Sequence, residues 1–153
     1  MLLEWESLSL EGGSRSVASI TANPAGPPVT DAGLEYLYEH ALHLPPIGKL
    51  DLSGTEITDA GLKHLKREDK GLWQRSVCVL NLSCTEVTDA GLEYLKWFSP
   101  LRVLDLHETQ VTDAGLEHLK GMDIDTVNVT GTRVTDAGIE ELRRALPSCK
   151  VIH

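Results

Sequence analysis

The 153-residue sequence predicts an α/β fold, a right-handed solenoid with a parallel sheet on its concave face and short helices on its convex face. Three observations lead to this prediction. A six-residue motif of the form VTDAGL occurs five times, a strand-like pattern precedes each of the last four copies, and helix-like spacing of apolar residues follows the motif. Strand and helix therefore alternate along the chain, as they do in stacked repeats.

The motif copies are separated by steps that suit one strand and one short helix. They begin at Val29, Ile57, Val87, Val111 and Val134, so the steps are 28, 30, 24 and 23 residues. A repeated Asp also raises the alternative of a repeated metal ligand or catalytic carboxylate. Calcium-loaded β-helices, however, repeat every nine residues or so. The spacing therefore favours an architectural role for the motif.

Within the motif, each residue type suits the start of a helix. Thr is a preferred N-cap, and an Asp directly after it favours the positive end of the helix dipole. We therefore predict that a helix starts at Thr58 and Asp59, and at the equivalent pairs. Ala60 and Gly61 place almost no side chain on the first turn, although Gly inside a helix costs about 1 kcal/mol relative to Ala. The simplest reason is that the first turn lies close against a neighbouring repeat.

The strand-like pattern is apolar-x-x-apolar-x-apolar-x-x-Thr, and its period-two pair predicts a short half-buried strand. Its copies are Ile47, Leu50, Leu52, Thr55; Val77, Leu80, Leu82, Thr85; Leu101, Leu104, Leu106, Thr109; and Ile124, Val127, Val129, Thr132. The helical spacing after the motif is given by Leu34, Leu37; Leu62, Leu65; Leu92, Leu95, Phe98; Leu116, Leu119, Met122; and Ile139, Leu142, Leu146. Near the N-terminus, Ala18 and Ile20 fit a strand in which Asn23 corresponds to Thr55. One more strand is indicated by Trp5, Leu8 and Leu10.

Together these patterns resemble leucine-rich repeat proteins of the ribonuclease-inhibitor-like superfamily, whose repeat reads LxxLxLxxN/C. The stretch "TEITDAGLKHL" is similar to the cysteine-containing subclass found in F-box substrate adaptors and related bacterial repeat proteins. The resemblance is nearly continuous over residues 29–153. The sequence differs from the family pattern at the position usually occupied by Asn or Cys, which here is Thr55 and its equivalents. We expect the hydroxyl groups of these threonines to hydrogen-bond the backbone of the neighbouring turn. No N-terminal segment reads as an F-box, so the resemblance does not imply the adaptor function.

We expect a single domain over residues 1–153. Residues 1–28 form an N-terminal cap and irregular first repeat, 29–146 the repeats, and 147–153 a C-terminal cap strand. The first two repeats carry the inserts "YEHALHLPP" and "KREDKGLWQRS", which predict longer helices or convex loops. Trp73 either folds over the core or is an exposed anchor for a partner. Trp97 leaves the same choice open, whereas Phe98 has the core spacing.

Composition limits the classes of partner. The net charge of −9 and a pI near 5.0 argue against nucleic acid or an acidic membrane, since both need basic patches. A protein with a basic segment suits this chain better. No apolar run approaches transmembrane length, and "MLLEWESLSL" has carboxylates where a signal peptide needs a basic start. We therefore expect a cytoplasmic protein.

The cysteines and histidines do not predict a catalytic or metal site. Cys78 and Cys84 are roughly 20 Å apart along an extended segment, too far for a disulfide, so reduced thiols are expected. None of the three cysteines has a CxxC partner, and no cofactor or zinc site is predicted. His64 and His118 are expected on the surface of the helices. No Ser-His-Asp or Cys-His arrangement follows from spacing, and catalysis is not expected.

The remaining strand residues define the candidate binding surface. Side chains between the apolar ones face away from the core, and stacking aligns them in rows about 4.8 Å apart. The row between the two core residues of each strand is expected to contain Ser19, Asp51, Asn81, Asp105 and Asn128. The row two positions earlier contains Val17, Lys49, Val79, Val103 and Thr126. The row two positions later contains Thr21, Ser53, Ser83, His107 and Thr130. The candidate partner-binding residues are Lys49, Asp51, Ser53, Val79, Asn81, Ser83, Val103, Asp105, His107, Thr126, Asn128 and Thr130.

Val79 and Val103 carry the preferred hypothesis. They are expected side by side and exposed, bordered by Asp51, Asp105 and His107, which suits the stem and charge of a partner's Lys or Arg. A merely solvated face is the alternative. Cation binding is a poor fit, because roughly 10 Å separates the two aspartates and calcium needs six to eight oxygens. The function expected is a non-catalytic protein-interaction module, monomeric alone; the alternatives are a scaffold or subunit of a larger assembly, and the substrate-recognition part of a ubiquitin-ligase-like complex.

Overall fold

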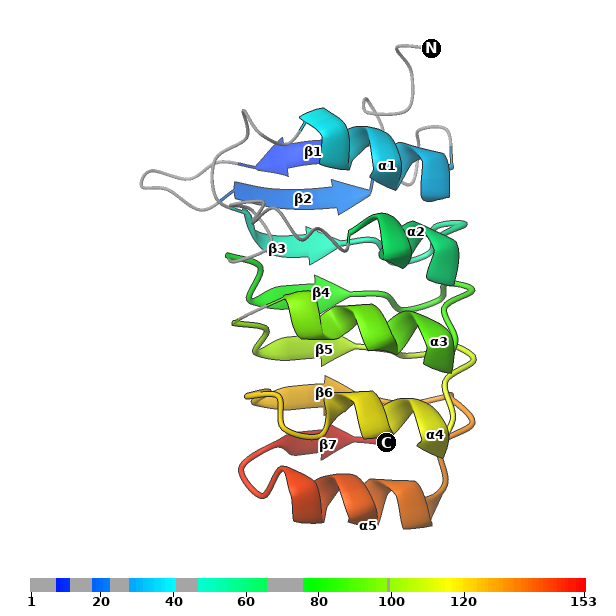
Figure 1. The fold of residues 1–153 in the computed structure, drawn as a ribbon, viewed down its shortest axis with the longest axis vertical. Coiled ribbons are helices and arrows are strands. Elements are labelled where there is room, and N and C mark those ends of the chain that lie inside the picture. The colour runs from blue at the N-terminus through cyan, green and yellow to red at the C-terminus, as the bar shows by residue number, and fades with distance from the viewer. Residues whose placement is uncertain (1–7, 12–17, 23–27, 41–46, 66–75, 99) are drawn as a thin grey trace.

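The computed structural model describes residues 8–11, 18–22, 28–40, 47–65, 76–98 and 100–153. Strands and helices alternate along this part of the chain, and they stack one above the other (Figure 1). The elements, with η for 3-10 helices, are β1 (Leu8–Glu11), β2 (Ala18–Ala22), α1 (Asp31–His40), β3 (Ile47–Asp51), α2 (Asp59–His64), β4 (Val79–Asn81), α3 (Asp89–Leu92), η3 (Glu93–Trp97), β5 (Val103–Asp105), α4 (Asp113–Leu116), η4 (Glu117–Leu119), β6 (Thr126–Asn128), α5 (Asp136–Ala145) and β7 (Lys150–Ile152).

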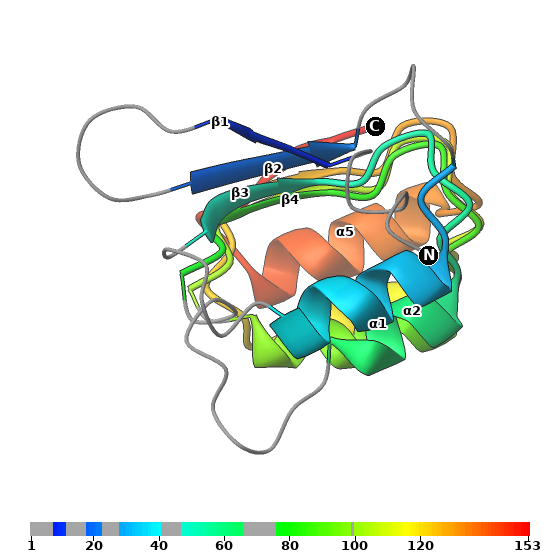
Figure 2. The same ribbon diagram turned by 90° about the horizontal axis from the view of Figure 1, so that it is seen from above.

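All of these strands lie in one sheet, in the order of the chain. Strands β2 to β7 pair in parallel, each with the next. The helices form a second layer against one face of the sheet, and none of the described helices lies on the opposite face (Figure 2). This two-layer stack of strand and helix units confirms the α/β repeat architecture predicted from the sequence.

A single apolar core fills the space between the two layers. Apolar residues at equivalent positions of consecutive strands, such as Leu50, Leu80 and Leu104, are fully buried. The helical positions Leu62, Leu92 and their equivalents cover these strand residues from the other layer. Burying one such side chain contributes about 1.5 to 3 kcal/mol relative to leaving it in water. Packing in the core therefore sustains helices that are only one or two turns long.

The N-terminal end of the sheet differs from the prediction in two respects. Strand β1 does not continue the parallel series but pairs antiparallel with β2, with Leu10 opposite Ile20. Ile20 lies beside Leu50 rather than Leu52, so Thr21 and not Ser19 is the neighbour of Asp51. A shift by two residues keeps the same side chains on the same face, so apolar alternation alone does not determine this register. The pairing is also irregular between Ala18 and Ser19.

The ladder threonines also bond differently from the expectation. Each hydroxyl donates to the carbonyl three residues earlier in its own turn, at 2.7 Å for Thr55 Oγ1 and Leu52 O. Thr85, Thr109 and Thr132 repeat this bond. The neighbouring turn is already satisfied by backbone amides, for example Gly54 N to Ser83 O at 2.9 Å. The short Thr side chain therefore stabilises the bend within its own repeat.

The two inserts are described only in part. Helix α1 has 10 residues and α2 has 6, while α5 has 10 without an insert, so the expectation of longer helices or convex loops in the first two repeats stays a prediction. Residues 41–46 and 66–75, including Trp73, lie outside the described part of the chain. Trp97 is half-buried beside the fully buried Phe98. The prediction that Phe98 has the core position is thus confirmed.

Candidate functional site

The threonines of the last four copies of the motif are N-caps, as predicted. Thr58 Oγ1 accepts a hydrogen bond from Ala60 N at 3.1 Å, and Thr88 and Thr112 make the same bond at the starts of α3 and α4. At α5 the acceptor is Thr135 Oγ1 and the donor is Gly138 N. Each cap supplies a partner for a backbone amide that the first turn of a helix leaves free.

The first four aspartates of the motif have a further role that the sequence did not reveal, because each connects its repeat to the next. Asp59 Oδ1 accepts from Thr88 N at 2.8 Å, and Asp59 Oδ2 accepts from Thr88 Oγ1 at 2.6 Å. The same pair of bonds joins Asp31 to Thr58, Asp89 to Thr112 and Asp113 to Thr135. Bonds from Thr135 hold the pKa of Asp113 below its usual value.

This aspartate ladder also explains the glycine of the motif. A Cβ added to Gly91 would collide with Asp59 Oδ1 of the preceding repeat and lie 3.0 Å from Leu62 Cδ1. Gly61, Gly115 and Gly138 meet the corresponding aspartate in the same way. Thr-Asp-Ala-Gly is therefore a contact between repeats, and its carboxylates serve the fold rather than a ligand.

The predicted rows on the open face of the sheet are present from β3 to β6. Lys49, Val79, Val103 and Thr126 are consecutive partners in the strand register, as are Asp51, Asn81, Asp105 and Asn128. Strand β7 extends both rows by Lys150 and Ile152. Ile152 is 38% exposed, which makes it one of the more exposed large apolar side chains in the described residues. The alternation in "KVI" signals these two positions, but the predicted rows stopped one strand too early.

The two valines lie side by side, although they are half-buried rather than fully exposed. Val79 and Val103 are direct register partners on β4 and β5. Among the other predicted site residues, Ser83 is only 8% exposed and offers little contact surface, whereas Ser53 is exposed. His107 and Thr130 are half-buried. The accessible apolar part of the face therefore centres on the valine pair.

The Asp and Asn residues of the central row have a local structural role. Asp51 Oδ1 accepts from Ser53 N at 3.2 Å, and Asp105 Oδ1 accepts from His107 N at 2.9 Å. Asn81 and Asn128 make the equivalent bond to the amide two residues later. Side chains of this length commonly close such turns. The repeated Asx residue is thus explained by the turn that follows each strand.

The expected acidic border is weaker than predicted. Lys49 Nζ lies 3.1 Å from Asp51 Oδ2, so this carboxylate is already paired. Burial alone would raise the pKa of Asp51, but hydrogen bonds from Ser53 and Lys49 outweigh it, and the pKa lies below its usual value. Asp105 makes no ion pair within the described residues. It is the carboxylate on this face best placed to meet a partner's cation.

A second group of polar side chains lies at the tips of the turns that follow β4 and β5. Cys84, His107 and Glu108 place ligand atoms within 4.8 Å of one another. Spacing along the sequence did not predict this group, because 23 and 24 residues separate Cys84 from the other two. The solenoid register brings them together. Partial desolvation, followed by the hydrogen bond and charge of Glu108, raises the pKa of the Cys84 thiol.

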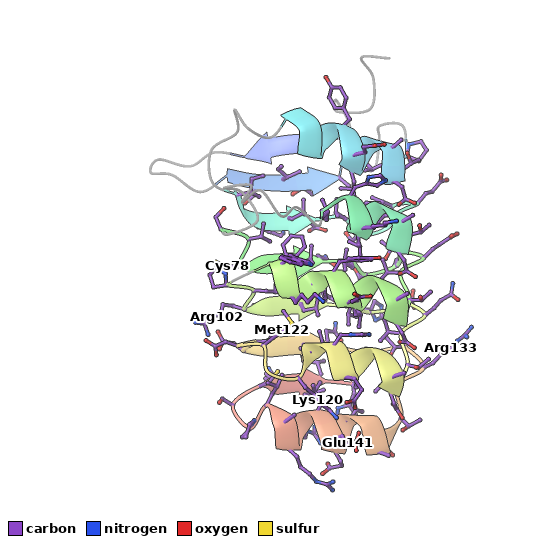
Figure 3. All side chains as sticks on the ribbon, viewed as in Figure 1. Cys78, Arg102, Lys120, Met122, Arg133 and Glu141 are labelled. Carbon is purple, nitrogen blue, oxygen red and sulfur yellow. The ribbon has the colours of Figure 1, made fainter. Side chains whose placement is uncertain are left out.

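A pocket of about 480 Å³ lies on the helix side, lined in part by Phe98, Leu101 and Met122. Lys120 and Met122 mark its place in Figure 3. Lys120 is engaged in ion pairs with Glu117 and Glu141. The charge that would attract an anionic ligand to this pocket is therefore already compensated.

These features define an α/β leucine-rich repeat solenoid. A family model described as Leucine Rich repeat matches residues 43–66 and 75–96, which contain β3 with α2 and β4 with α3. No curated protein matches the chain. Within the described residues, no helix combines the length and apolar character needed to cross a membrane.

Proposed function

We propose that this chain is a non-catalytic protein-interaction module whose partner binds the open face of the sheet. Leucine-rich repeats generally mediate protein–protein interaction, and stacked repeats present an extended surface suited to it. The observation that carries the proposal is the pairing of Val79 with Val103 in the middle of a face that none of the described helices covers.

The chemistry of this face favours a partner that presents a Lys or Arg. The aliphatic stem of such a side chain packs on Val79 and Val103, while its charge meets Asp105, two residues along the same strand from Val103. The net charge of −9 attracts a basic segment over longer distances. In the row that contains Val79 and Val103, Lys49 lies at one end and Lys150 at the other. Their positive charges limit how far a basic segment extends along this row.

The size of the face limits the affinity that the sheet alone provides. The parallel strands β2 to β7, about 4.8 Å apart, make a sheet roughly 25 Å wide, with on the order of a few hundred Å² of contact surface. A standard interface uses about 800 Å² per partner. The partner therefore also contacts the turns at the edge of the sheet, or it binds weakly. We further propose a cytoplasmic chain that is monomeric without its partner; the free thiols of Cys78, Cys84 and Cys149 suit a reducing compartment.

A crosslinking experiment tests where the partner binds. A photo-reactive amino acid replaces Val103 on the sheet face in one variant and His118 on the exposed helix side in the other. We expect a crosslinked partner from the Val103 variant and none from the His118 variant. A partner crosslinked only from position 118 would place the binding surface on the helices and refute the proposal.

The affinity of the crosslinked partner for further variants of the chain then tests which side chains it binds. Val79→Glu with Val103→Glu removes binding while the circular dichroism spectrum stays unchanged, since both side chains face away from the core. Val79→Thr with Val103→Thr, which keeps the shape, is the milder matched control. Asp105→Asn introduces the residue that β4 and β6 already carry, so the turn bond to His107 persists. This variant slows association and flattens its dependence on salt, because exposed charge mainly steers the encounter.

A further inference from the structure

The side chains of Cys84, His107 and Glu108 converge at the edge of the open sheet face. Cys84 Sγ lies 3.6 Å from Glu108 Oε2, and His107 Nε2 lies 3.8 Å from Glu108 Oε1. The three residues come from two adjacent repeats, whose turns are joined by the backbone bond from Cys84 N to His107 O at 2.8 Å. Their relative positions are therefore fixed by the stacking of the solenoid.

The hydrogen bond on the other ring nitrogen determines what His107 offers to this group. His107 Nδ1 lies 3.0 Å from the backbone oxygen of Thr130. A carbonyl oxygen accepts hydrogen bonds and does not donate them, so Nδ1 carries the proton. In the neutral ring, Nε2 then presents a lone pair towards the carboxylate of Glu108. Two acceptors that face each other form a place that suits a cation such as a metal ion.

Metal-binding histidines commonly show the same arrangement. The nitrogen that does not bind the metal donates to a carboxylate or a backbone carbonyl, which fixes the orientation and tautomer of the ring. His107 has this orientation without any ion being needed to impose it. The bond to Thr130 is thus an observation separate from the closeness of the three side chains.

The donor atoms and their separations indicate which ion fits. Tetrahedral zinc binds sulfur at about 2.3 Å and nitrogen or oxygen at about 2.0 to 2.2 Å, which separates the donors by roughly 3.3 to 3.8 Å. The separations of 3.6 and 3.8 Å run to the two different oxygens of Glu108, and one ligand atom from each of the three residues lies within 4.8 Å of the others, so small side-chain rotations bring the donors to this geometry. A mixture of thiolate, imidazole and carboxylate favours zinc-like transition metals over calcium or magnesium, which prefer oxygen alone.

We propose that Cys84, His107 and Glu108 bind a divalent transition metal ion of the zinc type. The ion takes the position between Nε2 and the carboxylate, the thiol gives up its proton to solvent on binding, and a fourth position remains for water. The proposal replaces the expectation, drawn from sequence spacing, that the chain holds no zinc site. It does not depend on the proposed partner, although His107 places the ion beside the protein-binding face.

Cobalt titration of the whole chain under reducing conditions tests this site. Co²⁺ bound by a thiolate gives a charge-transfer absorption, and isothermal titration with Zn²⁺ gives affinity and stoichiometry. We expect one ion per chain. Cys84→Ser abolishes the charge-transfer band, and His107→Gln and Glu108→Gln each weaken Zn²⁺ binding by at least about tenfold, the loss typical of a damaged metal site.

Matched variants separate this site from other thiols and imidazoles. Cys78→Ser and the exposed His118→Gln should leave the band and the affinity unchanged. Cys84→Gly introduces the residue found at this position in the turns after β3 and β6, and serves as the folding control for the loss of the thiol. The proposal is overturned if Co²⁺ gives no thiolate band, or if Zn²⁺ binds equally well after His107→Gln and Glu108→Gln.

Discussion

Each connection from a strand to the next helix has two halves that behave in opposite ways. The half that starts the helix reads Thr-Asp-Ala-Gly in every copy of the motif. In the half that follows the strand, the residue at the tip has a left-handed backbone conformation. The type of this residue differs from repeat to repeat. This position is occupied by Gly54, Cys84, Glu108 and Gly131, with φ of 66°, 55°, 53° and 71°.

The contacts of the two halves explain the contrast. In the helix-start half, Asp59 bonds Thr88 and also occupies the space above Gly91, so three motif residues depend on one another across the repeat boundary. At the tip of the strand-end half, the side chains of Cys84 and Glu108 are exposed, and the backbone bond from Cys84 N to His107 O joins the repeats whatever side chains stand there. Repetition thus marks the residues that build the stack, and variation marks the positions that are free to serve a function.

The largest expected effect on stability comes from adding a side chain at the glycine of the helix-start half. Gly91→Leu forces a side chain against Asp59, Leu62 and Val87, and should lower the free energy of unfolding by about 3 kcal/mol. Ala90→Lys is the control, because Ala90 is exposed on the same turn, and its effect should stay within about 0.5 kcal/mol. Urea unfolding measures both. Equal losses for the two variants would show that the glycine is not packed as described.

A smaller loss is expected when the ladder bond is removed. Asp59→Ala leaves Thr88 N and Thr88 Oγ1 without their acceptor and should cost about 2 kcal/mol. The matched control is Asp136→Ala, the last copy of the motif, whose carboxylate accepts no hydrogen bond within the described residues. Only its interaction with the helix dipole is lost, at under about 1 kcal/mol. If the two aspartates were equally important in urea unfolding, the dipole rather than the ladder would explain the motif.

The ladder also predicts a dependence on pH. Because bonds from Thr135 lower the pKa of Asp113 in the folded chain, this carboxylate adds stability above its ordinary value of 3.8. That contribution is lost as the pH falls from 3.8 through the lower pKa that Asp113 has in the folded chain. Asp113→Asn should therefore be less stable than the parent at neutral pH, and the difference should shrink in acid. Unfolding curves recorded from pH 7 to pH 2 check this, and a constant difference would contradict it.

The smallest effects are expected in the variable half, and they should have opposite signs. Gly54→Ala places a Cβ on a residue with φ of 66°, although no atom lies within 4 Å of it, and should cost about 1 kcal/mol. Cys84→Gly removes the side chain that is strained at a φ of 55°, and should stabilise the chain by between 0 and about 1 kcal/mol. Thermal unfolding compares the two. A destabilising Cys84→Gly would mean that the thiol serves the fold.

The sequence predicted the parts of this fold that depend on a single repeat. The N-cap at Thr58, the buried Leu50 and the burial of Phe98 all follow from local patterns that one repeat contains. The rows from β3 to β6 followed as well, because copies of the same length and pattern stack in register. These inferences needed only the period of the pattern and the preferences of individual residue types.

Features that depend on two repeats at once were not predictable in the same way. The bond from Asp59 to Thr88 requires knowledge of how consecutive helices are offset. The position of Ile20 beside Leu50 involves a two-residue shift that leaves the apolar face unchanged. Cys84 and Glu108 meet only because equivalent turns are stacked. Aligning the repeats position by position, rather than searching for short spacings, would have revealed this last pair.

The central claim is that the aspartate of one repeat and the glycine of the next form a single contact. A double-mutant cycle with Asp59→Ala and Gly91→Ala tests it most directly, with the free energy of unfolding measured for the parent, both single variants and the double variant. Removing the carboxylate vacates the space that the new Cβ needs, so Gly91→Ala should cost less in the Asp59→Ala background than in the parent, by about 1 kcal/mol. Losses that simply add would contradict the claim.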